Sequence, residues 1–519
     1  MTIINDDELL YTSDELRFRE EIWAYVDSEI RPIAPRIEAG DYEPHELFKR
    51  IGDKGLTGLL IPEEHGGSGK PFMYQLLAGE EISAVSPTLT MMFGASCTLS
   101  AIPILRFGTA EQKEKYLVPV AKGEKIGALA VTEPNVGSDT AGMETKATWD
   151  DKEEVWILDG EKRFITNGSI ADHIVTFAIT DAGVDSKSGM SAFIVETSWE
   201  GFEVVKDYQL MGRSGVYNTH FKLKSVKVPK ANLLGKVNQG FLILMDEFDS
   251  ERVGVAAEAL GCMRTPFEIA VEFSQNRVQF GRPISRFEGI SFKIADMATK
   301  MRAARLLTVT AARMVEKGLQ CTKEAAMAKL FATEASVEVC DFAMQILGGS
   351  GYVKNYYPVE RFYRDARLGT IGGGTSEIMQ FLIQREVYME SKRAIPSQKV
   401  FPAKGISFET LMKSIPKGFR ADRAEGVTAQ IQFLFEDNNP WLLRIHDKQC
   451  DVEQIQIDSC DMTVKTDAGT WQDIMLSKLD AMQAMMTGKV NIDTDDMDLL
   501  MKFARMFKFA VEIFQEEAS

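Results

Sequence analysis

Two groups of residues in this sequence have types and spacings that suit the binding of a phosphorylated ring compound. The turn at 134–137 places the hydroxyls of Thr132 and Ser138 beside backbone amides. Such donors suit an electron-rich ring and a diphosphate. Arg277 offers a forked guanidinium to phosphate, and the glycine pair at 348–349 lets backbone approach a ligand closely. Taken alone, Arg277 would be interpreted as a surface charge on a helix.

A third candidate for chemistry is the carboxylate of Glu251, which stands directly before Arg252. A desolvated glutamate whose pKa is raised toward neutrality is an effective general base. On its own, the simpler interpretation is a solvated helix residue that pairs with nearby cations. The sequence must therefore supply further reasons before Glu251 is given a catalytic role.

The cysteines and histidines indicate neither a metal site nor a redox site. The six cysteines are scattered without a C-x-x-C pair, and the five histidines form no ligand spacing with them. We interpret the cysteines as reduced and mostly buried thiols. No metal is expected.

The elements that must position these residues follow from the hydrophobic pattern. Helical periodicity from 14 to about 115 predicts a helical bundle, and short β-rich runs from 129 to 234 predict a small β-domain. Long helical periods return from 241 to 388, and a polar connector precedes mixed strands and Met-rich helices. The predicted fold is a multidomain α+β protein. Its predicted parts are 1–122, 123–236 and 237–392, a linker at 393–404, and a separate domain at 405–519.

Length and charge restrict the classes of function. A chain of 519 residues is long enough for several cores. Its formal charge of −17 argues against a nucleic-acid partner, which would need a basic face. Apolar runs such as 56–62 and 253–260 are shorter than the roughly 20 residues of a membrane helix, so no membrane span is predicted. The acidic residues at 6–8 do not match a signal peptide, and we expect a cytoplasmic, bacterial protein.

Several motifs occur in the order that is typical of the acyl-CoA dehydrogenase family. The segment L-A-V-T-E-P-N-V-G-S-D at 129–139 resembles the family's T-E-P-x-x-G-S-D signature. Further matches are P-E-E-H-G-G-S-G at 62–69, L-D-G-E-K-R-F-I-T-N at 158–167, R-V-Q-F-G-R-P at 277–283, Q-I-L-G-G-S-G-Y at 345–352, R-D-A at 364–366 and G-T-S-E at 374–377. The resemblance covers residues 10–390 and implies the family's fold, a helical bundle, a small β-domain and a second helical bundle.

The resemblance implies an FAD site with two halves. The flavin ring would be lined by Leu129, Val131, Thr132, Gly137, Ser138, Phe164, Ile165 and Thr166. The adenine-diphosphate half would be held from a neighbouring subunit by Arg277, Phe280, Gln345, Gly348 and Gly349. Thr375 and Glu377 would complete the site. A homo-oligomer, either a dimer or a tetramer, is therefore implied.

The family pattern also directs attention to the base. Most members carry the catalytic glutamate directly before the Gly-Thr of the last motif, where this sequence has Gly373. In the isovaleryl-CoA and long-chain branches the base stands on a helix before an arginine, which is the position of Glu251. The resemblance thus implies that Glu251 is the base and that the backbone N–H of Gly373 donates to the thioester carbonyl. The acyl-CoA would be contacted by Ser138, Asp249, Arg252 and Gly374.

The C-terminal block, from about 405 to 512, is similar to sterol carrier protein type two. The similarity is carried by I-Q-F-L-F at 431–435, W-L-L-R-I at 441–445, D-M-T-V at 461–464, Trp471 and A-M-M-T-G-K-V at 484–490. Flexible methionine side chains can line a lipid tunnel, here Met475, Met482, Met485, Met486, Met497, Met501 and Met506. The resemblance implies an α/β domain that binds a fatty acyl chain or another lipid; plain core packing is the alternative for the methionines.

Together these resemblances imply FAD-dependent α,β-dehydrogenation of a long or branched fatty acyl-CoA to the trans-2-enoyl-CoA, as in β-oxidation. Electrons would pass to an electron-transfer flavoprotein. Three alternatives stay open: a non-catalytic lipid- or acyl-CoA-binding protein whose base was lost at Gly373, an enoyl-CoA reductase, and an acyl-CoA oxidase on the same scaffold.

Overall fold

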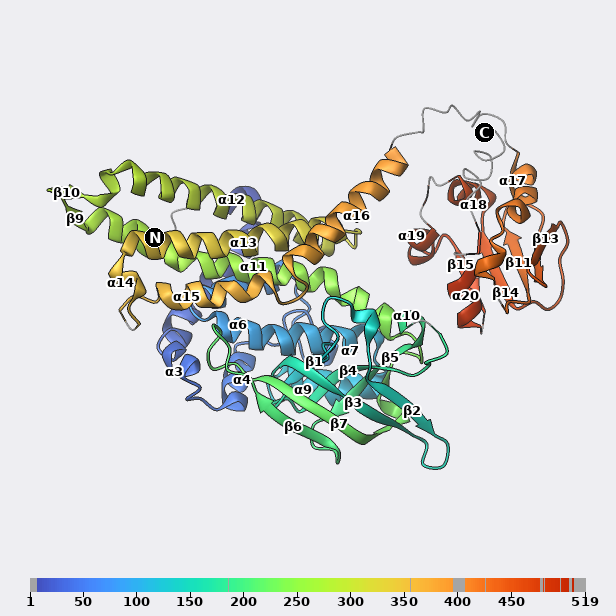
Figure 1. Cartoon of the computed structure of the whole chain (residues 1–519), viewed down its shortest axis with the longest axis horizontal. Helices are drawn as coiled ribbons and strands as arrows, with labels where there is room; N and C mark the ends of the chain where they lie inside the picture. The colour runs from blue at the N-terminus through green and yellow to red at the C-terminus, as the bar shows by residue number, and fades with distance from the viewer. Residues whose placement is uncertain are drawn as a thin grey trace. The chain divides into compact units, whose positions relative to one another are not determined.

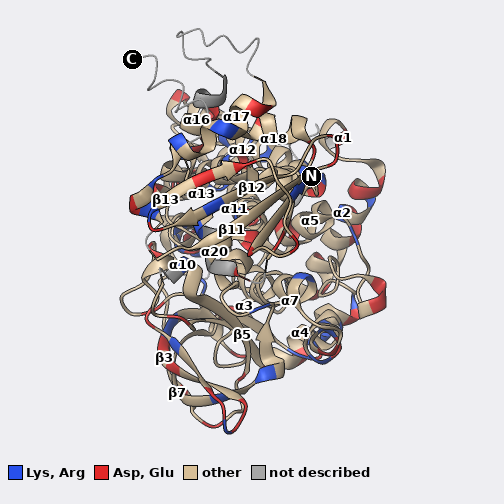
Figure 2. Cartoon of the chain, turned by 90° about the vertical axis from the view of Figure 1, so that its right-hand side faces the viewer, with Lys and Arg blue, Asp and Glu red and all other residues tan. Residues whose placement is uncertain are grey.

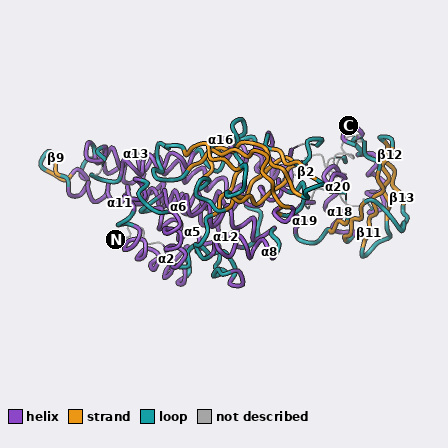
Figure 3. Tube along the Cα trace, turned by 90° about the horizontal axis from the view of Figure 1, so that it is seen from below, coloured by secondary structure: helices purple, strands orange, loops and turns teal. Residues whose placement is uncertain are grey.

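The computed structural model describes residues 7–184, 186–354, 356–394, 407–424, 426–476, 479, 481–494, 496–503 and 506–507. The chain divides into two compact units, Met1–Glu386 and Val387–Ser519 (Figure 1). In each unit the strands gather into a group with helices around it (Figure 3). Nearly all of the predicted linker at 393–404 lies outside the described residues. On the face drawn in Figure 2, basic and acidic positions are interspersed.

The first unit begins with a group of helices. The principal ones are α2 (Ser13–Tyr25), α4 (Pro44–Asp53), α5 (Phe72–Ser83), α6 (Pro87–Gly94) and α7 (Ala101–Phe107). Helix α2 starts at a capping box, in which the Thr12 side chain accepts from the Glu15 amide and Glu15 accepts from the Thr12 amide. The continuous helical stretch Pro87–Phe107 is long and apolar enough to cross a membrane, a feature that the shorter runs noted in the sequence did not include. Within the described residues 78% of its apolar window is buried in the fold, as in a core helix of a globular protein.

The middle of the first unit is an eight-stranded sheet with the order β6-β7-β3-β2-β4-β5-β8, and β1 pairs with β4. The strands are β1 (Gly127–Ala130), β2 (Lys146–Asp150), β3 (Val155–Thr166), β4 (His173–Ile179), β5 (Met190–Glu196), β6 (Phe202–Asp207), β7 (Asn218–Pro229) and β8 (Leu233–Leu234). Nearly every residue of β4 and β5 is buried, because these strands lie against the helices. The register of β3 against β7 shifts between Lys162 and Ile165.

A second helical group follows the sheet. It contains α11 (Gly240–Asn276), α12 (Glu288–Glu316), α13 (Thr322–Leu347), α15 (Val359–Ala366) and α16 (Ser376–Ala394), with a small hairpin of β9 (Val278–Gln279) and β10 (Arg282–Pro283). At 1.5 Å per residue, α11 spans about 55 Å. It packs closely on α5 at Gly261, where an added Cβ would lie 2.1 Å from the carbonyl oxygen of Glu80. Small residues on α11 and α13 let these long helices lie side by side (Figure 1).

Buried ion pairs join four helices of the first unit. Glu80 and Glu81 of α5 meet Arg19 of α2, Arg264 of α11 and Arg305 of α12. Distances in this network include 2.7 Å from Arg19 Nε to Glu81 Oε1 and 2.9 Å from Arg305 Nη1 to Glu80 Oε2. Burial alone would raise the pKa of Glu80, but the guanidiniums of Arg305 and Arg19 outweigh it and hold this pKa at about 2. The Glu80 carboxylate therefore stays ionised inside the scaffold.

The second unit has a five-stranded sheet in the order β13-β12-β11-β14-β15. Its strands are β11 (Ala429–Phe435), β12 (Trp441–His446), β13 (Gln449–Glu453), β14 (Met462–Thr466) and β15 (Asn491–Asp493), and its helices include α17 (Phe408–Ser414), α18 (Ala468–Met475), α19 (Ala481–Met486) and α20 (Met497–Phe503). Met475 and Met506 are buried in its core, and Met485 packs against it. The side chains of Met482, Met486, Met497 and Met501 lie outside the described residues.

Candidate active site

The T-E-P loop and strand β3 are locked together by a buried ion pair. Lys162 Nζ lies 2.8 Å from Glu133 Oε1, and both side chains are almost completely buried. Glu133 also accepts from the amides of residues 144 and 145, and the Arg163 amide donates to the Thr132 carbonyl. Burial lowers the pKa of Lys162 to about 8, although the carboxylate of Glu133 opposes this effect. The pair fixes the loop on which Thr132 stands, a role that the sequence analysis did not assign.

The end of β3 presents an aromatic ring to the surface. The register shift after Lys162 lets Phe164 adopt a φ of 59°, and its side chain is 56% exposed and lies 4.9 Å from the ring of Tyr208. Ile165 points into the sheet's core, so only its backbone could face a bound ring. Thr166 is half-buried at the end of the strand. Leu129 and Val131 pack partly against the core, whereas Gly137 and Ser138 are exposed.

Glu251 lies where a side chain of residue 373 would begin. A Cβ placed on Gly373 would lie 3.1 Å from Glu251 Oε1. Gly373 and Gly374 have φ angles of 62° and 88°, which favour glycine. Burial raises the pKa of Glu251, and the charges of Arg252 and Lys329 oppose that rise. The structure thus brings together Glu251 and Gly373, two residues that the sequence analysis assigned to one reaction centre.

The predicted substrate contacts Asp249 and Arg252 interact with each other beside this carboxylate. Arg252 Nη1 lies 2.8 Å from Asp249 Oδ1, and the Thr322 hydroxyl donates to Asp249 Oδ2 at 2.7 Å. Burial lowers the pKa of Arg252, and the nearby carboxylates oppose this effect. The Nε of Arg252 is buried and has no hydrogen-bond partner in the part of the chain that the structure describes. Arg252 therefore has one N–H donor that the described residues leave unused.

Two further charged residues near Glu251 were missed by the sequence analysis. Lys329 of α13 is 1% exposed, and its ammonium donates to the Gly374 carbonyl. Glu247 lies one turn before Glu251 on α11, and neither of its buried carboxylate oxygens has a partner among the described residues. Burial, followed by the charge of Glu251, raises the pKa of Glu247 well above its usual value. In the sequence, each of these residues is a charged residue within a largely apolar helical segment. That pattern does not reveal which other residues the charged group contacts.

Thr375 and Glu377 lie at the start of α16. The Thr375 hydroxyl accepts from the Ile378 amide at 3.3 Å, as a helix cap does. The Glu377 side chain stands in the first turn, where a negative charge is favourable. Both residues therefore have a local structural function, and their predicted contact with FAD stays a prediction.

The residues predicted to hold the adenine-diphosphate half lie at the far end of the helical group. Arg277 ends α11, and Phe280, at the turn of the β9–β10 hairpin, is 93% exposed. Gln345 and the glycines at 348–349 lie at the end of α13, and the glycines face open space. Along α11 the separation from Glu251 to Arg277 is about 39 Å. The two predicted halves of the FAD site therefore do not meet within one chain (Figure 1).

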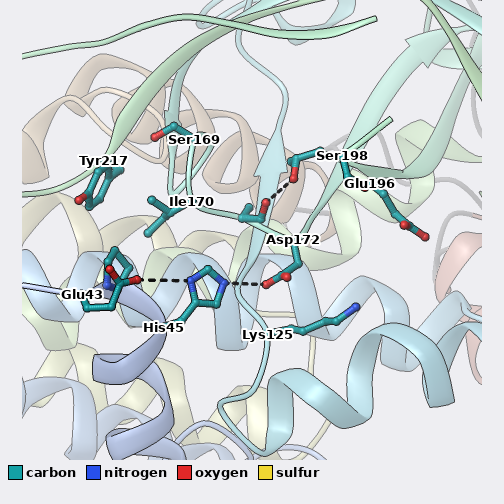
Figure 4. A pocket seen from close by; sticks show the side chains of 12 residues that line it. Glu43, His45, Lys125, Ser169, Ile170, Asp172, Glu196, Ser198 and Tyr217 are labelled. Carbon is teal, nitrogen blue, oxygen red and sulfur yellow. Dashed lines mark hydrogen bonds and ion pairs between the residues drawn. The ribbon is translucent and has the colours of Figure 1, made fainter. Parts of the chain in front are cut away.

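A separate surface cavity of about 460 Å³ lies between the first helices and the sheet. Figure 4 shows His45 in it between Glu43 and Asp172, with His45 Nε2 3.2 Å from Asp172 Oδ2. Lys125 is the other basic residue of its lining. The Asp172 carboxylate also accepts from the Ile126 amide at 2.8 Å, which gives it a structural function. None of the residues assigned to chemistry lines this cavity.

The residues present suit FAD. Phe164 and Phe280 are exposed aromatic rings, and the backbone beside Gly137, Gly348 and Gly349 faces open space that could admit a diphosphate. Arg277 adds a forked cation at the end of α11. The group near Phe164 suits a planar ring, and the group near Arg277 suits an adenine ring and phosphates.

Comparisons with known proteins identify the family and the fold. The chain matches the family models described as acyl-CoA dehydrogenase N-terminal domain at 12–124, middle domain at 128–226 and C-terminal domain at 238–388, and the SCP-2 sterol transfer family at 408–508. An acyl-CoA dehydrogenase of Bacillus subtilis is 43% identical and aligns over 72% of this chain and 98% of its own length. The caffeyl-CoA reductase–Etf complex subunit CarC of Acetobacterium woodii is 41% identical over 67% of this chain and 90% of its own. The structure of butyryl-CoA dehydrogenase from Megasphaera elsdenii has a TM-score of 0.70 and 38% identity, and covers 73% of this chain and 99% of its own.

Proposed function

Because the chain belongs to the acyl-CoA dehydrogenase family, whose members are FAD-dependent oxidoreductases acting on a CH–CH bond, we propose that Glu251 is the base that removes the α-proton of a fatty acyl-CoA. The observation that carries this proposal is the position of the Glu251 carboxylate, 3.1 Å from where a Cβ of residue 373 would stand. A glutamate supplied from α11 therefore reaches the place that a side chain at 373 would occupy.

The environment of Glu251 suits proton abstraction from carbon. Burial raises the pKa of its carboxyl toward the range in which a base works best near neutral pH. Arg252 and Lys329 limit this rise, so the carboxylate form stays accessible. When bound, FAD supplies the acceptor for the hydride lost from the β-carbon. The amide of Gly373 is the proposed donor to the thioester carbonyl, where negative charge develops.

The cofactor and the oligomer are linked in this proposal. The exposed Phe280 and the residues near Arg277 would complete the FAD site of a neighbouring subunit, because they lie about 39 Å from Glu251 along α11. A dimer or tetramer follows, with Gln345, Gly348 and Gly349 on the same contributed surface. Thr375 and Glu377 would contact the cofactor from the start of α16.

The substrate is proposed to be a long or branched fatty acyl-CoA, which is converted to the trans-2-enoyl-CoA in β-oxidation-type catabolism. A base on the helix before an arginine supports this choice, since the resemblance places that arrangement in the isovaleryl-CoA and long-chain branches. Ser138, Asp249, Arg252 and Gly374 are the proposed contacts. An electron-transfer flavoprotein is the proposed electron acceptor, and the cytoplasm of a bacterium is the proposed location. A relative that is named as a subunit of a reductase–Etf complex supports such a partner.

That same relative favours a second candidate function, reduction of an enoyl-CoA on the same scaffold. The two directions share the base and the cofactor, and they differ in the supply of electrons. The second unit, which matches the SCP-2 sterol transfer family, is proposed to bind a fatty acyl chain or another lipid. Its mixture of aromatic and methionine side chains in one core supports an apolar ligand.

Glu251→Gln tests the base, because it keeps the volume of the side chain and removes the basic carboxylate. We expect FAD content and acyl-CoA binding to be retained while anaerobic flavin reduction by a panel of acyl-CoAs slows by about 10²–10⁴-fold or more. Glu272→Gln, at an exposed position of the same helix, is the matched control. Unchanged flavin reduction in Glu251→Gln would overturn the assignment. No reduction of the wild-type flavin by any acyl-CoA would favour the non-catalytic alternative.

A further inference from the structure

Lys329 meets the reaction centre from a third element. Its ammonium donates to the carbonyl of Gly374, and its Cε lies 3.8 Å from the place where a Cβ of Gly373 would stand. The same place is 3.1 Å from Glu251 Oε1. One side chain of α13 thus contacts both the glycine turn and the surroundings of the proposed base.

The burial of this lysine needs an explanation. The other buried residues nearby on α13 are small and uncharged, and they include the alanines 325, 326, 328 and 332 together with Thr333 and Ser336. A buried ammonium loses hydration, whereas a methionine of similar length would fill the same space without that loss. A charge retained at such a position has a use that an apolar side chain would not serve.

Charged groups surround Lys329 unequally. On α11, Glu251 attracts its charge and Arg252 repels it, and on α13 Glu334 attracts it. Within the described residues its ammonium donates to a neutral carbonyl, that of Gly374. Lys162, by contrast, is buried against the carboxylate of Glu133 at 2.8 Å. The positive charge of Lys329 therefore acts mainly on the reaction centre.

We propose that Lys329 is a positioning residue with two effects: it holds the Gly374 carbonyl so that the turn presents the Gly373 amide to the thioester, and its charge keeps Glu251 ionised. This inference rests on the proposed function, in which Glu251 is the base. It adds a residue that acts through Glu251 and the glycine turn.

The charge has a definite consequence for the pH profile. Because a nearby cation favours the carboxylate, removing the charge of Lys329 raises the pKa of Glu251 and moves the acid limb of flavin reduction to higher pH. Burial lowers the pKa of Lys329 itself to about 8, with Glu251 opposing the effect. Lys329 therefore carries its charge below about pH 8, on the acid side, where the ionisation of Glu251 needs it.

Three substitutions separate the two effects. Lys329→Met removes both the donor and the charge, Lys329→Gln keeps a donor without charge, and Lys329→Arg keeps both. In the Met and Gln variants we expect the acid limb to move up by about one pH unit. In the Arg variant, which keeps the positive charge, the acid limb should stay near the wild-type pH. At the optimum pH, reduction should slow about tenfold more in the Met variant than in the Gln variant, because only the Gln side chain still offers a hydrogen-bond donor to the Gly374 carbonyl.

The measurement is anaerobic flavin reduction by one acyl-CoA from pH 5.5 to 9.5, together with FAD content and acyl-CoA affinity. Lys300→Met is the control, because Lys300 pairs with Glu338 at 2.7 Å elsewhere on α12 and α13. An acid limb that stays fixed in the Gln variant, while Glu251→Gln is inactive, would overturn the inference about Lys329 alone. If the Met variant does not fold, the Gln and Arg variants still show whether the charge of residue 329 sets the pH of the acid limb. An active Glu251→Gln would instead overturn the proposed function.

Discussion

Helix α11 reaches two groups of buried carboxylates, and the two groups are neutralised in different ways. Near Arg264, each carboxylate of α5 bonds two arginines, at distances that include 2.7 Å from Arg264 Nη1 to Glu81 Oε1. About 20 Å along the helix, Glu251 is faced by cations that do not fully offset burial. The pKa of Glu80 is held at about 2, whereas the pKa of Glu251 is raised.

This difference shows how one helix serves both the scaffold and the chemistry. Complete pairing fixes the ionised state, so the group near Arg264 stabilises helix packing over a wide pH range. Incomplete pairing leaves Glu251 with a raised pKa, and buried carboxyls with raised pKa values are typical of functional sites. Both carboxyls are buried, yet the pKa of Glu80 is lowered and that of Glu251 is raised. The difference arises because Glu80 bonds two arginines, whereas the cations near Glu251 do not fully offset its burial.

The largest expected effect on stability comes from breaking the paired group. Glu80→Gln leaves the guanidinium of Arg305 buried without its carboxylate, so we expect a loss of about 3–5 kcal/mol in the free energy of unfolding. The measurement is denaturant unfolding of the FAD-loaded protein at pH 7. Glu338→Gln, which breaks an exposed ion pair with Lys300, should cost less than about 1 kcal/mol.

The same variant has a pH signature. The folded-state pKa of Glu80 lies below the ordinary value of 4.5, so its stabilising contribution is present above pH 4.5 and is lost as pH falls toward about 2. The difference in stability between wild type and Glu80→Gln should therefore shrink over that acid window. A difference that stays constant down to pH 3 would contradict the ionised, fully paired state of this group.

The next largest effect is expected on flavin reduction, at the reaction centre around Glu251. A glutamate introduced at residue 373 needs the space that the Glu251 carboxylate fills, 3.1 Å from the new Cβ. We therefore expect Glu251→Ala combined with Gly373→Glu to reduce its flavin about tenfold or more faster than Glu251→Ala alone. Glu251→Gln combined with Gly373→Glu should show no such gain, since the amide still occupies the space. Recovery will be incomplete in the first case, because a φ of 62° strains a non-glycine residue by about 1–3 kcal/mol.

The measurement is stopped-flow flavin reduction in Glu251→Ala, in Glu251→Gln and in each of them combined with Gly373→Glu. Equal recovery in the two double variants would mean that the side chain of residue 251 does not fill that place. FAD content must be measured in parallel, since strain at the turn can also weaken the start of α16, where Thr375 caps the helix.

The sequence predicted the larger elements and the motif loops, because these depend on local pattern. The long helical periods around Glu251 and the short β-rich runs near Thr166 are visible as periodicity. The motif order was specific enough to indicate the family, which the comparisons confirm. The position of Glu251 opposite Gly373 was a hypothesis from resemblance, and the geometry now supports it.

Contacts between distant helices could not be predicted in this way. Lys329 and Gly374 are 45 positions apart, and only the packing of α13 against the glycine turn brings them together. Glu133 and Lys162 both stand within motifs, yet their ion pair depends on a loop folding back on β3. Periodicity indicates that a position is buried. It does not indicate which atom that position meets.

The smallest effect is expected at Glu247, and it is the most direct test of the comparison. Its two oxygens are buried without partners among the described residues, and burial and the charge of Glu251 raise its pKa. The raised pKa favours the neutral carboxyl, and Glu247→Gln replaces that neutral group by another of nearly equal size. At or below pH 4.5 we expect the free energy of unfolding to change by less than about 1 kcal/mol, and at pH 7 we expect no loss, in contrast to Glu80→Gln. A raised folded-state pKa contributes stability that is complete below pH 4.5 and is lost as pH rises through the folded pKa. Relative to the wild type, Glu247→Gln should therefore become progressively more stable as pH increases, as unfolding midpoints measured from pH 5 to 9 would show. A loss as large as that of Glu80→Gln at pH 7 would mean that Glu247 is ionised and paired. The buried carboxylates near Glu251 and those near Arg264 would then both be neutralised by paired cations.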